Sequence, residues 1–478
     1  MKIIFFPKGV DIIQNKEIVY EKIYSDFLIR LCEGEFPLGS HMPSLPELCT
    51  QYDVGKNTII KVVQKLKNNG FIETSSGKVG QVLFDCNNLE QYVKELPGFV
   101  CDKDILLDYY YAMEILFPAL YAYAPSAYSE EDLLKIKDLV EEFINCELDG
   151  KTYINLSIKL SEAITSAIEN QLIKKIVEIT MQKTMLPAML LVGHNTVFTK
   201  LLFKVRDKIA LLYEALKQND KLQLKNCWGE ILPIYNTILK EAISLGIFPN
   251  KPSTQMFNIF EVMDDEKSFI IATSFLEQIL NGKYTNNDLL PSIAQAQSYY
   301  QVSEITVRRA YYILCEMGYT QTLNGIGTRV VSFFVPKSSY FLEQSAINRK
   351  EYYCEAVEFL EVTCADIVRA AKFLPFSKLR NDMDSPWNFK HRYSVAIIFY
   401  HLFKGANSDA VFSMYNVAGT YLYWTSYLKG IPATEELGEI NHAECINAID
   451  LLEHKSFDEA TELLLKLLRT LYPIEKQL

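Results

Sequence analysis

One stretch of this sequence occurs twice with the same spacing, and that repeat constrains the fold more than any other feature. Pro43-Ser44 returns as Pro291-Ser292, and 291 minus 43 is 248. The same offset relates further pairs in segments 27–77 and 275–325: Phe27 and Phe275, Gly34 and Gly282, Val54 and Val302, Thr58 and Thr306, Gly70 and Gly318, and Gly77 and Gly325. Two copies separated by a long intervening segment indicate a duplicated domain rather than a solenoid.

The helical pattern within the first copy is typical of a helix-turn-helix. An apolar helix is expected near residues 17–32, and a second begins at Ser44, whose hydroxyl can cap the first turn. A third helix follows the turn at residues 53–56 and ends at Gly70. Its apolar stripe at helical spacing consists of Ile59, Val62 or Val63, and Leu66.

Two strands are expected after the third helix. Segments 71–74 and 79–84 alternate between apolar and polar residues, and Ser76-Gly77 together with Gly80 favours a hairpin. A helix-turn-helix followed by such a hairpin is a winged helix, a module that places its third helix in the major groove of DNA.

The third helix of the first copy has a basic face. No acidic residue lies between Val54 and Ile72; lysine and threonine side chains bind phosphates, while an asparagine such as Asn57 can read a base edge. The alternative interpretation is an ordinary solvated helix face, and the repeat and the wing favour DNA binding over it. The candidate DNA-binding residues of this copy are Ser44, Lys56, Asn57, Thr58, Lys61, Lys65, Gly77 and Lys78.

The second copy is less basic, because Glu304 at the start of its third helix would repel phosphate. The spacing of Gly325 and Gly327 also allows a phosphate-loop interpretation. No lysine-serine pair follows these glycines, so a wing hairpin is expected instead. The candidate DNA-binding residues of this copy are Ser292, Ser303, Thr306, Arg308, Arg309, Gly325 and Arg329.

These segments resemble the GntR family of bacterial transcription regulators. In that family the second helix starts with Pro-Ser-Glu-Arg and the third with Val-Ser-Arg-x-Thr-Val-Arg. The corresponding segments here are 43–46 and 54–60 in the first copy, and 291–294 and 302–308 in the second. The resemblance implies DNA binding, but the family's contacting arginines fall on Pro46, Lys56 and Ile60 in one copy and on Ala294, Glu304 and Arg308 in the other.

Residues 104–248 and 345–478 show long helical apolar periodicity. Both segments are similar to the helical ligand-binding domain of the FadR subgroup of this family, which often holds a metal through one aspartate and three histidines. Two positions that the resemblance implies as ligands are Ser157 and Ser161, and only His442 could match a ligand histidine in the last segment. One histidine does not hold a divalent cation, so we expect no metal.

The helical segments also contain candidates for an effector site. Ligand sites are mostly apolar with a few placed polar groups. The alternative is that the aromatic residues pack the core and the domain interface. The candidates are Tyr109, Tyr110, Glu114, Tyr121 and His194.

Composition limits the class of protein. A chain of 478 residues with 49% hydrophobic and 22% charged residues is globular and long enough for several domains. With a formal net charge of -11, any DNA contact must come from local basic faces. The scattered cysteines, without a Cys-x-x-Cys pair, favour reduced thiols, and the apolar run at residues 3–6 is too short for a signal peptide or a membrane span. We therefore expect a cytoplasmic protein.

The sequence thus predicts a mainly α fold with winged helix-turn-helix domains at 10–86 and 267–335 and FadR-like all-helical domains at 104–248 and 345–478. The predicted function is a regulator that binds double-stranded DNA as an intramolecular pseudo-dimer on an asymmetric operator and senses a small organic effector. We expect no cofactor, no membrane partner and, without a catalytic motif, no enzyme; self-association beyond the pseudo-dimer stays open. The alternative is a regulator that has lost DNA binding and acts as a protein scaffold or ligand sensor.

Overall fold

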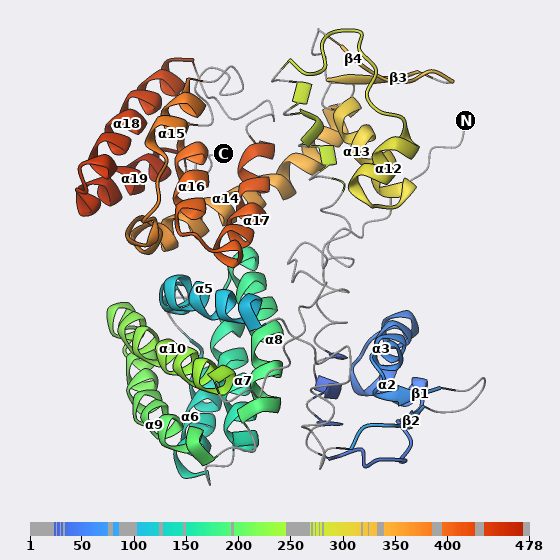
Figure 1. Ribbon diagram of the computed structural model, residues 1–478, viewed down its shortest axis with the longest axis vertical. Coiled ribbons are helices and arrows are strands. Elements are labelled where there is room, and N and C mark those ends of the chain that lie inside the picture. Colours follow the sequence, from blue (N-terminus) through green and yellow to red (C-terminus); the bar gives the residue numbers. More distant parts are fainter. Residues whose placement is uncertain are drawn as a thin grey trace. The chain divides into compact units, whose positions relative to one another are not determined.

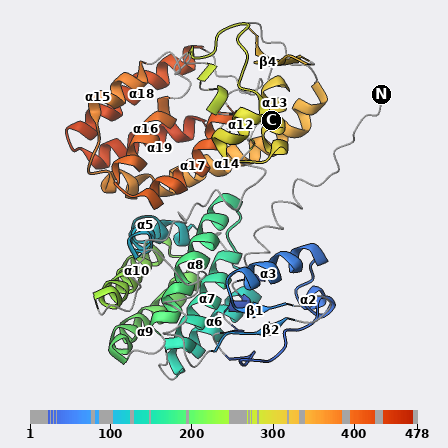
Figure 2. The ribbon, with the colours of Figure 1, turned by 45° about the vertical axis from the view of Figure 1, so that its right-hand side comes forward.

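The computed structural model describes residues 23–24, 26–28, 30–31, 34–74, 80–85, 103–123, 128–146, 150–192, 196–244, 268, 271–272, 274–276, 278–279, 282–316, 319–323, 325–331, 339–384, 394–425 and 435–471. The chain divides into two compact units: unit 1 is Met1–Glu169 with Lys174–Phe257, and unit 2 is Asn170–Ile173 with Asn258–Leu478. Each unit contains a small module of helices with a hairpin and a set of long helices (Figure 1, Figure 2).

The first module, which we define as the described residues of 23–85, begins its helix-turn-helix where the sequence predicts. Helix α2 (Leu45–Gln51) is capped by Ser44: the backbone amide of Glu47 donates to Ser44 Oγ at 3.4 Å, and the amide of Ser44 donates to Glu47 Oε2 at 2.7 Å. This reciprocal pair satisfies amides that the first turn of a helix leaves unpaired. Asp53, at a φ of 50°, lies in the turn that leads to α3 (Lys56–Asn68).

The hairpin of the first module is short. Strand β1 (Ile72–Glu73) pairs antiparallel with β2 (Gln81–Val82), with Ile72 opposite Val82. These strands are shorter than the predicted segments 71–74 and 79–84, but the backbone amide of Leu83 still donates to the Phe71 carbonyl at 2.9 Å. The antiparallel pairing therefore continues one residue beyond the strands.

One side of α3 forms the core of the first module. Ile59, Val62 and Leu66 are fully buried, whereas Val63 is half-buried. The structure thus resolves the alternative between Val62 and Val63 in favour of Val62. Residues from the preceding helix and from the hairpin are buried in the same module: Phe27, Leu28, Leu31, Phe71 and Phe84.

The long helices of unit 1 form an all-helical bundle. They are α5 (Lys103–Ala122), α6 (Glu130–Asn145), α7 (Gly150–Ser166), α8 (Gln171–Val192), α9 (Thr196–Lys217) and α10 (Lys221–Ser244). Helix α10 packs against α5 and α9, and α6 packs against α7 and α9. Apolar residues on these helices are buried between them, as the long periodicity of residues 104–248 predicts.

Unit 2 contains a second module, which we define as the described residues of 268–331. Helix α12 (Ile293–Tyr300) is capped by Ser292 with Gln295 as its reciprocal partner, and α13 (Glu304–Glu316) follows. Strand β3 (Thr320–Leu323) then pairs antiparallel with β4 (Gly327–Val330). Its core contains residues from the helices and the hairpin, among them Phe275, Leu276, Val307, Ala310, Leu314 and Val330.

The two modules follow the same backbone path at the offset seen in the sequence. The strand pair Ile72–Val82 of the first module corresponds to Thr320–Val330 of the second, each residue shifted by 248 positions. The isolated bridge His41–Gln81 corresponds to Leu289–Arg329 with the same shift. The hydrogen bonds between each hairpin and the segment before the second helix also correspond. The Gly39 amide donates to the Val82 carbonyl at 2.8 Å, and the Asn287 amide donates to the Val330 carbonyl at 2.9 Å.

The long helices of unit 2 form a second all-helical bundle. They are α14 (Ser339–Ala370), α15 (Phe376–Met383), α16 (Ser394–Gly405), α17 (Asp409–Thr425), α18 (Glu435–Glu453) and α19 (Phe457–Leu471). Helix α14 packs against α17 and α19, and α16 packs against α17. Phe403 stacks on both Phe359 and Tyr415 in the middle of the bundle, with ring centroids 5.9 and 5.0 Å apart.

The mainly helical fold class, with a small β wing after the first helix-turn-helix, is confirmed. The described helices of the two bundles extend from Lys103 to Ser244 and from Ser339 to Leu471. The boundaries proposed for the domains stay predictions.

Packing of α3 gives a prediction for stability. Replacing the buried Leu66 with alanine should lower the free energy of unfolding by about 2–5 kcal/mol, because it leaves a cavity in the module core. Ile60 lies on the same helix but is exposed. Ile60→Ala is therefore the matched control and should change the free energy by less than about 0.5 kcal/mol. Urea denaturation followed by circular dichroism measures both, and equal effects would contradict the assigned core.

Candidate functional site

The outward face of α3 is basic. Burial of Ile59, Val62 and Leu66 turns the opposite side of the helix to solvent. That side exposes Lys56, Asn57, Ile60, Lys61 and Gln64. The helix carries four lysines and no acidic residue, so its face is positive in an otherwise acidic chain. Such a face attracts phosphates.

The predicted DNA-binding residues of the first module differ in their accessibility. Lys56, Asn57 and Lys61 are exposed. Thr58 is only 7% exposed, so its hydroxyl is poorly placed for phosphate and we assign it to the start of the helix. Lys65 is half-buried, and its Nζ lies 4.4 Å from the centroid of the Tyr24 ring, an attractive cation–π geometry.

The remaining candidates of the first module are in the cap and the wing. Ser44 is half-buried and its hydroxyl caps α2, which leaves the amino end of this helix as its potential phosphate contact. Gly77 and Lys78, at the predicted wing tip, lie outside the described residues.

The outward face of α13 has a different chemistry. It exposes Glu304, Ile305, Arg308, Arg309 and Tyr312. Arg308 Nε donates to Glu304 Oε1 at 2.6 Å, and Nη2 of the same guanidinium lies 2.6 Å from that oxygen. Glu304 thus neutralises an arginine of its own helix. The face of the second module is therefore less positive than that of the first.

Two of the predicted DNA-binding residues of the second module, Ser303 and Thr306, are hydrogen-bonded to each other at the start of α13. The Ser303 and Thr306 hydroxyls are 2.7 Å apart, and the Thr306 amide donates to Ser303 Oγ at 3.2 Å. Thr306 is only 8% exposed. Like Thr58, Thr306 is poorly placed for phosphate. We assign Thr58 to the start of α3 and Thr306 to the start of α13. Ser292 is exposed and caps α12.

Two glycines of the second module lie at the turn of its wing. Gly325, in the turn after β3, and Gly327, the first residue of β4, have φ values of 77° and 135°, a region that L side chains rarely adopt. Because these glycines join two strands rather than a strand and a helix, the hairpin interpretation replaces the phosphate-loop interpretation. Arg329 is half-buried on β4, and its Nη2 donates to Gln321 Oε1 at 3.3 Å.

The bundle of unit 1 contains an interior pocket. It is small and partly open to solvent. Helices α5, α7, α8, α9 and α10 contribute its lining, and none of the lining residues is charged. The lining consists of Met113, Leu160, Met181, Ile209, Ile231 and Leu232 together with Tyr121, Ser157, Ser161, Trp228 and Tyr235.

Hydroxyl groups in this pocket bond to one another. Tyr121 Oη lies 2.8 Å from Ser161 Oγ, and Ser157 Oγ lies 3.2 Å from Tyr235 Oη. The Tyr121 ring stacks on the indole of Trp228, with centroids 4.2 Å apart. Burial raises the pKa of both Tyr121 and Tyr235 above the usual range, so both phenols stay protonated and neutral.

One residue of the pocket lining has a buried polar atom that forms no hydrogen bond with the described residues. Trp228 Nε1 is buried and has no hydrogen-bond partner in the part of the chain that the structure describes. A buried N–H without a partner costs free energy, and a ligand with an acceptor oxygen would satisfy it. The described lining thus combines apolar side chains, neutral hydroxyl groups and one indole N–H.

The structure brings only one of the predicted effector residues into this pocket, Tyr121. Tyr109 and Tyr110 are buried on α5 outside its lining, as the packing alternative predicts. Glu114 Oε1 accepts a hydrogen bond of 2.5 Å from Asn236 Nδ2. His194 lies outside the described residues.

Sequence reasoning missed Ser157, Ser161, Trp228 and Tyr235 as pocket residues. A signal for the serines was present: they are four residues apart, hence on one face of a helix, at the positions where the resemblance implies ligands. Trp228 and Tyr235 are seven apart on α10 and share a face in the same way. Nothing in the sequence links that face to the serines of α7.

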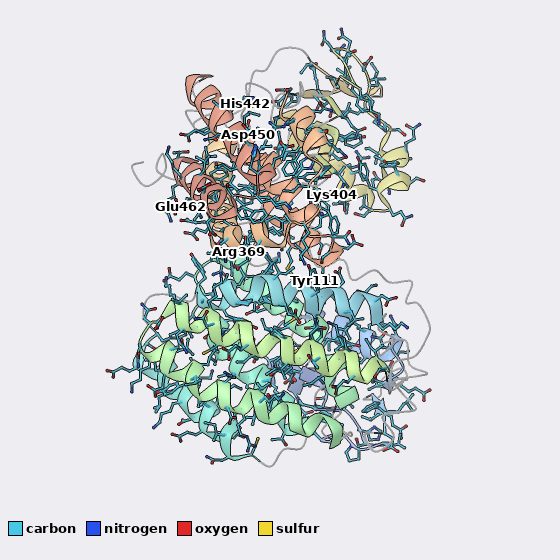
Figure 3. All side chains as sticks on the ribbon, turned by 60° about the vertical axis from the view of Figure 1, so that its left-hand side comes forward. Tyr111, Arg369, Lys404, His442, Asp450 and Glu462 are labelled. Carbon is cyan, nitrogen blue, oxygen red and sulfur yellow. The ribbon has the colours of Figure 1, made fainter. Side chains whose placement is uncertain are left out.

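Within the described residues, no group of three histidine, cysteine, aspartate or glutamate side chains could hold a metal ion. Ser394 Oγ lies 3.1 Å from His442 Nδ1, so α16 and α18 meet at the histidine that the sequence singles out (Figure 3). The described helices also include none that is long and apolar enough to cross a membrane. The absence of a metal stays a prediction.

Comparison with known proteins gives one family match and several weak structural ones. Residues 19–80 match the model of the bacterial regulatory proteins of the gntR family, with no second segment detected. A search of curated proteins found no match. The prediction of a GntR-like winged helix is thus confirmed for the first copy.

The structural likenesses are to regulators of bacteria. Streptococcus agalactiae GntR is 14% identical over 45% of this chain and 99% of its own, with a TM-score of 0.25. E. coli McbR/YncC is 16% identical over 47% of this chain and 98% of its own, with a TM-score of 0.26. A putative transcriptional regulator GntR from Rhodococcus sp. RHA1 is 16% identical over 45% and 97%, with a TM-score of 0.24.

Two of the four lysines of α3, Lys61 and Lys65, give a prediction for DNA affinity. Lys61→Ala should lower the slope of log affinity against log salt by roughly one, because each phosphate contact releases about one counterion. Lys65→Ala should lower it by less, since the Lys65 ammonium lies over Tyr24. Lys135→Ala, exposed on α6, is the control and should leave the slope unchanged. If Lys61→Ala also left it unchanged, α3 would not be in the interface.

Proposed function

We propose that this chain is a DNA-binding transcription regulator of the gntR family and not an enzyme; the family match lies in residues 19–80. In this proposal the chain reads DNA with two modules on one polypeptide. The observation that carries the proposal is the exposed basic face of α3 inside the domain that matches the family. In a winged helix this face lies against the major groove.

The second module supports a pseudo-dimer. Helix-turn-helix proteins commonly bind as dimers, so that two third helices lie about one DNA turn apart. Here α12, α13 and the β3–β4 hairpin follow the backbone path of the first module. We propose that the two modules act as the two subunits of a dimer would. Because their outward faces differ, the operator has two unequal half-sites.

Residues of the two faces have separate roles in this proposal. Lys56 and Lys61 bind phosphates of the first half-site, and Asn57 reads a base edge there. Arg308 and Arg309 contact the second half-site, and the amino ends of α2 and α12, capped by Ser44 and Ser292, approach phosphates. Arg329, Gly325, Gly77 and Lys78 belong to the wings in this assignment, while Thr58, Thr306, Ser303 and Lys65 support the helices that carry the contacts.

The bundle of unit 1 supports effector sensing. The described residues that line its pocket are uncharged and include two tyrosines and two serines, and Trp228 Nε1 has no hydrogen-bond partner among the described residues. We propose an uncharged organic effector that accepts a hydrogen bond from this indole, with no metal or other cofactor. Charged ligands are disfavoured because burial of a charge without a counter-charge costs several kcal/mol.

A second candidate function is a regulator that has lost DNA binding and acts on protein partners. The observation that favours it is the set of exposed apolar side chains on the second module: Leu289, Tyr299, Ile305, Tyr312 and Ile326. The acidic net charge of -11 also favours it. The basic, acid-free face of α3 argues against it for the first module.

Selection of bound sequences from a random pool of duplexes tests the proposed function. The full chain should enrich a site with two unlike halves, because one module presents lysines and asparagine and the other arginines and isoleucine. The chain with Lys56→Ala and Lys61→Ala should lose one half of the preference. A palindromic site would contradict the pseudo-dimer, and no enrichment at all would favour the scaffold alternative.

The effector proposal is tested by identifying the small molecules that copurify with the chain. Small molecules released by denaturing the purified chain should include an uncharged compound, detectable by mass spectrometry. Ser161→Leu fills the pocket and should reduce the amount of that compound at least severalfold. Thr237→Leu, which adds the same bulk at an exposed position of α10, is the control. A carboxylate released together with a metal would contradict the proposal.

A further inference from the structure

The second module has apolar side chains at outward positions where the first has polar ones. The offset of 248 pairs Leu289 with His41, Tyr299 with Gln51, Ile305 with Asn57, Tyr312 with Gln64 and Ile326 with Lys78. All of these apolar residues of the second module are exposed. The two modules therefore keep one backbone frame and present different surface chemistry on it.

Ile305 occupies the most informative of these positions. It is the second residue of α13, as Asn57 is the second residue of α3, and the amino-terminal residues of such a helix are nearest the base edges. Its side chain is 64% exposed and is not part of the core of its module. An exposed isoleucine at this place has no role in stability that the packing explains.

Charged residues alternate with the apolar ones along the same face of α13. Arg308 and Arg309 lie between Ile305 and Tyr312, about one turn from each. The guanidinium of Arg308 bonds to Glu304. A side chain set that places isolated apolar groups between guanidiniums fits a DNA groove, in which phosphates lie at both edges and base edges between them.

We infer that the second module recognises thymine, with Ile305 packing against the C5-methyl group in the major groove. Thymine is the base that presents an apolar group there, and apolar side chains read it by contact, whereas asparagine reads adenine by two hydrogen bonds. The inference rests on the proposed function and specifies its second half-site. That half-site carries thymine where the first half-site carries the base read by Asn57.

The frame of the second module favours DNA over a protein partner on this face. A protein partner requires only an apolar surface, yet the module also keeps the capped α12, the register of the hairpin and the positive φ at Gly325. These features set the angle of α13 and of the wing, which matters for a groove. Binding of a protein to the face is an outcome that the experiment below detects.

The experiment replaces thymine with uracil, which removes only the methyl group. Sequences are first selected from a random pool with the full chain and with Ile305→Ala, and positions whose preference is lost in the variant are assigned to the second module. Thymines at these positions are then replaced by uracil in duplexes of the selected sequence. The wild-type chain should bind the uracil duplex about fourfold more weakly, the effect of one lost buried methyl group.

Two variants make the result specific. Ile305→Ala should bind thymine and uracil duplexes equally, because the contact with the methyl group is gone. Ile305→Asn copies the residue of the first module and should move the preference at that position from thymine to adenine. Asn57→Ala is the matched control: it should weaken binding of the first half-site while the uracil effect persists. Ile305 is exposed, so these substitutions leave the core intact.

The outcomes separate this inference from the proposed function. Specific binding with equal affinity for thymine and uracil duplexes would overturn the inference and leave the proposed function standing. Failure to enrich any sequence would overturn both. If Ile305→Ala changed the sedimentation mass of the chain and left its sequence preference unaltered, the face would be a protein interface, and the inference would again be overturned.

Discussion

Each module depends on the burial of one stripe of its third helix. A helix that buries Ile59, Val62 and Leu66, or Val307, Ala310 and Leu314, has no freedom to turn its other residues inward. The residues that meet a partner are therefore fixed by the residues that pack the core. Because the core stripes are equivalent in both modules, the outward positions are equivalent too, and only their chemistry has changed.

The sequence predicts the frame of the modules well because its signals are local. Ser44 and Ser292 were expected to begin helices and do so, and Gly34 and Gly282, which the repeat pairs, both have positive φ values. Accessibility was harder to predict. The spacing of Thr58 and Lys65 gives no indication that one is buried and that the other lies over Tyr24, because those facts depend on a helix distant in sequence.

The pocket of unit 1 shows the same limit more clearly. Tyr121, Ser161 and Trp228 lie on three different helices and are at least 40 positions apart in the sequence, and only packing brings them together. Where the resemblance implied charged metal ligands, the chain places hydroxyls that satisfy one another. A cluster of neutral groups can be buried at far lower cost than carboxylates could without a metal, which explains how this interior persists without a counter-charge.

The shared frame of α3 and α13 has a consequence for how such a protein changes over time. In a symmetric dimer, a substitution in the helix that reads bases appears in both subunits and demands that both halves of the target change together. In the pseudo-dimer that we propose, both helices belong to one polypeptide, and a single codon change such as one at Ile305 alters one half alone. Target sites can then drift one base pair at a time, with the unaltered half holding the regulator in place.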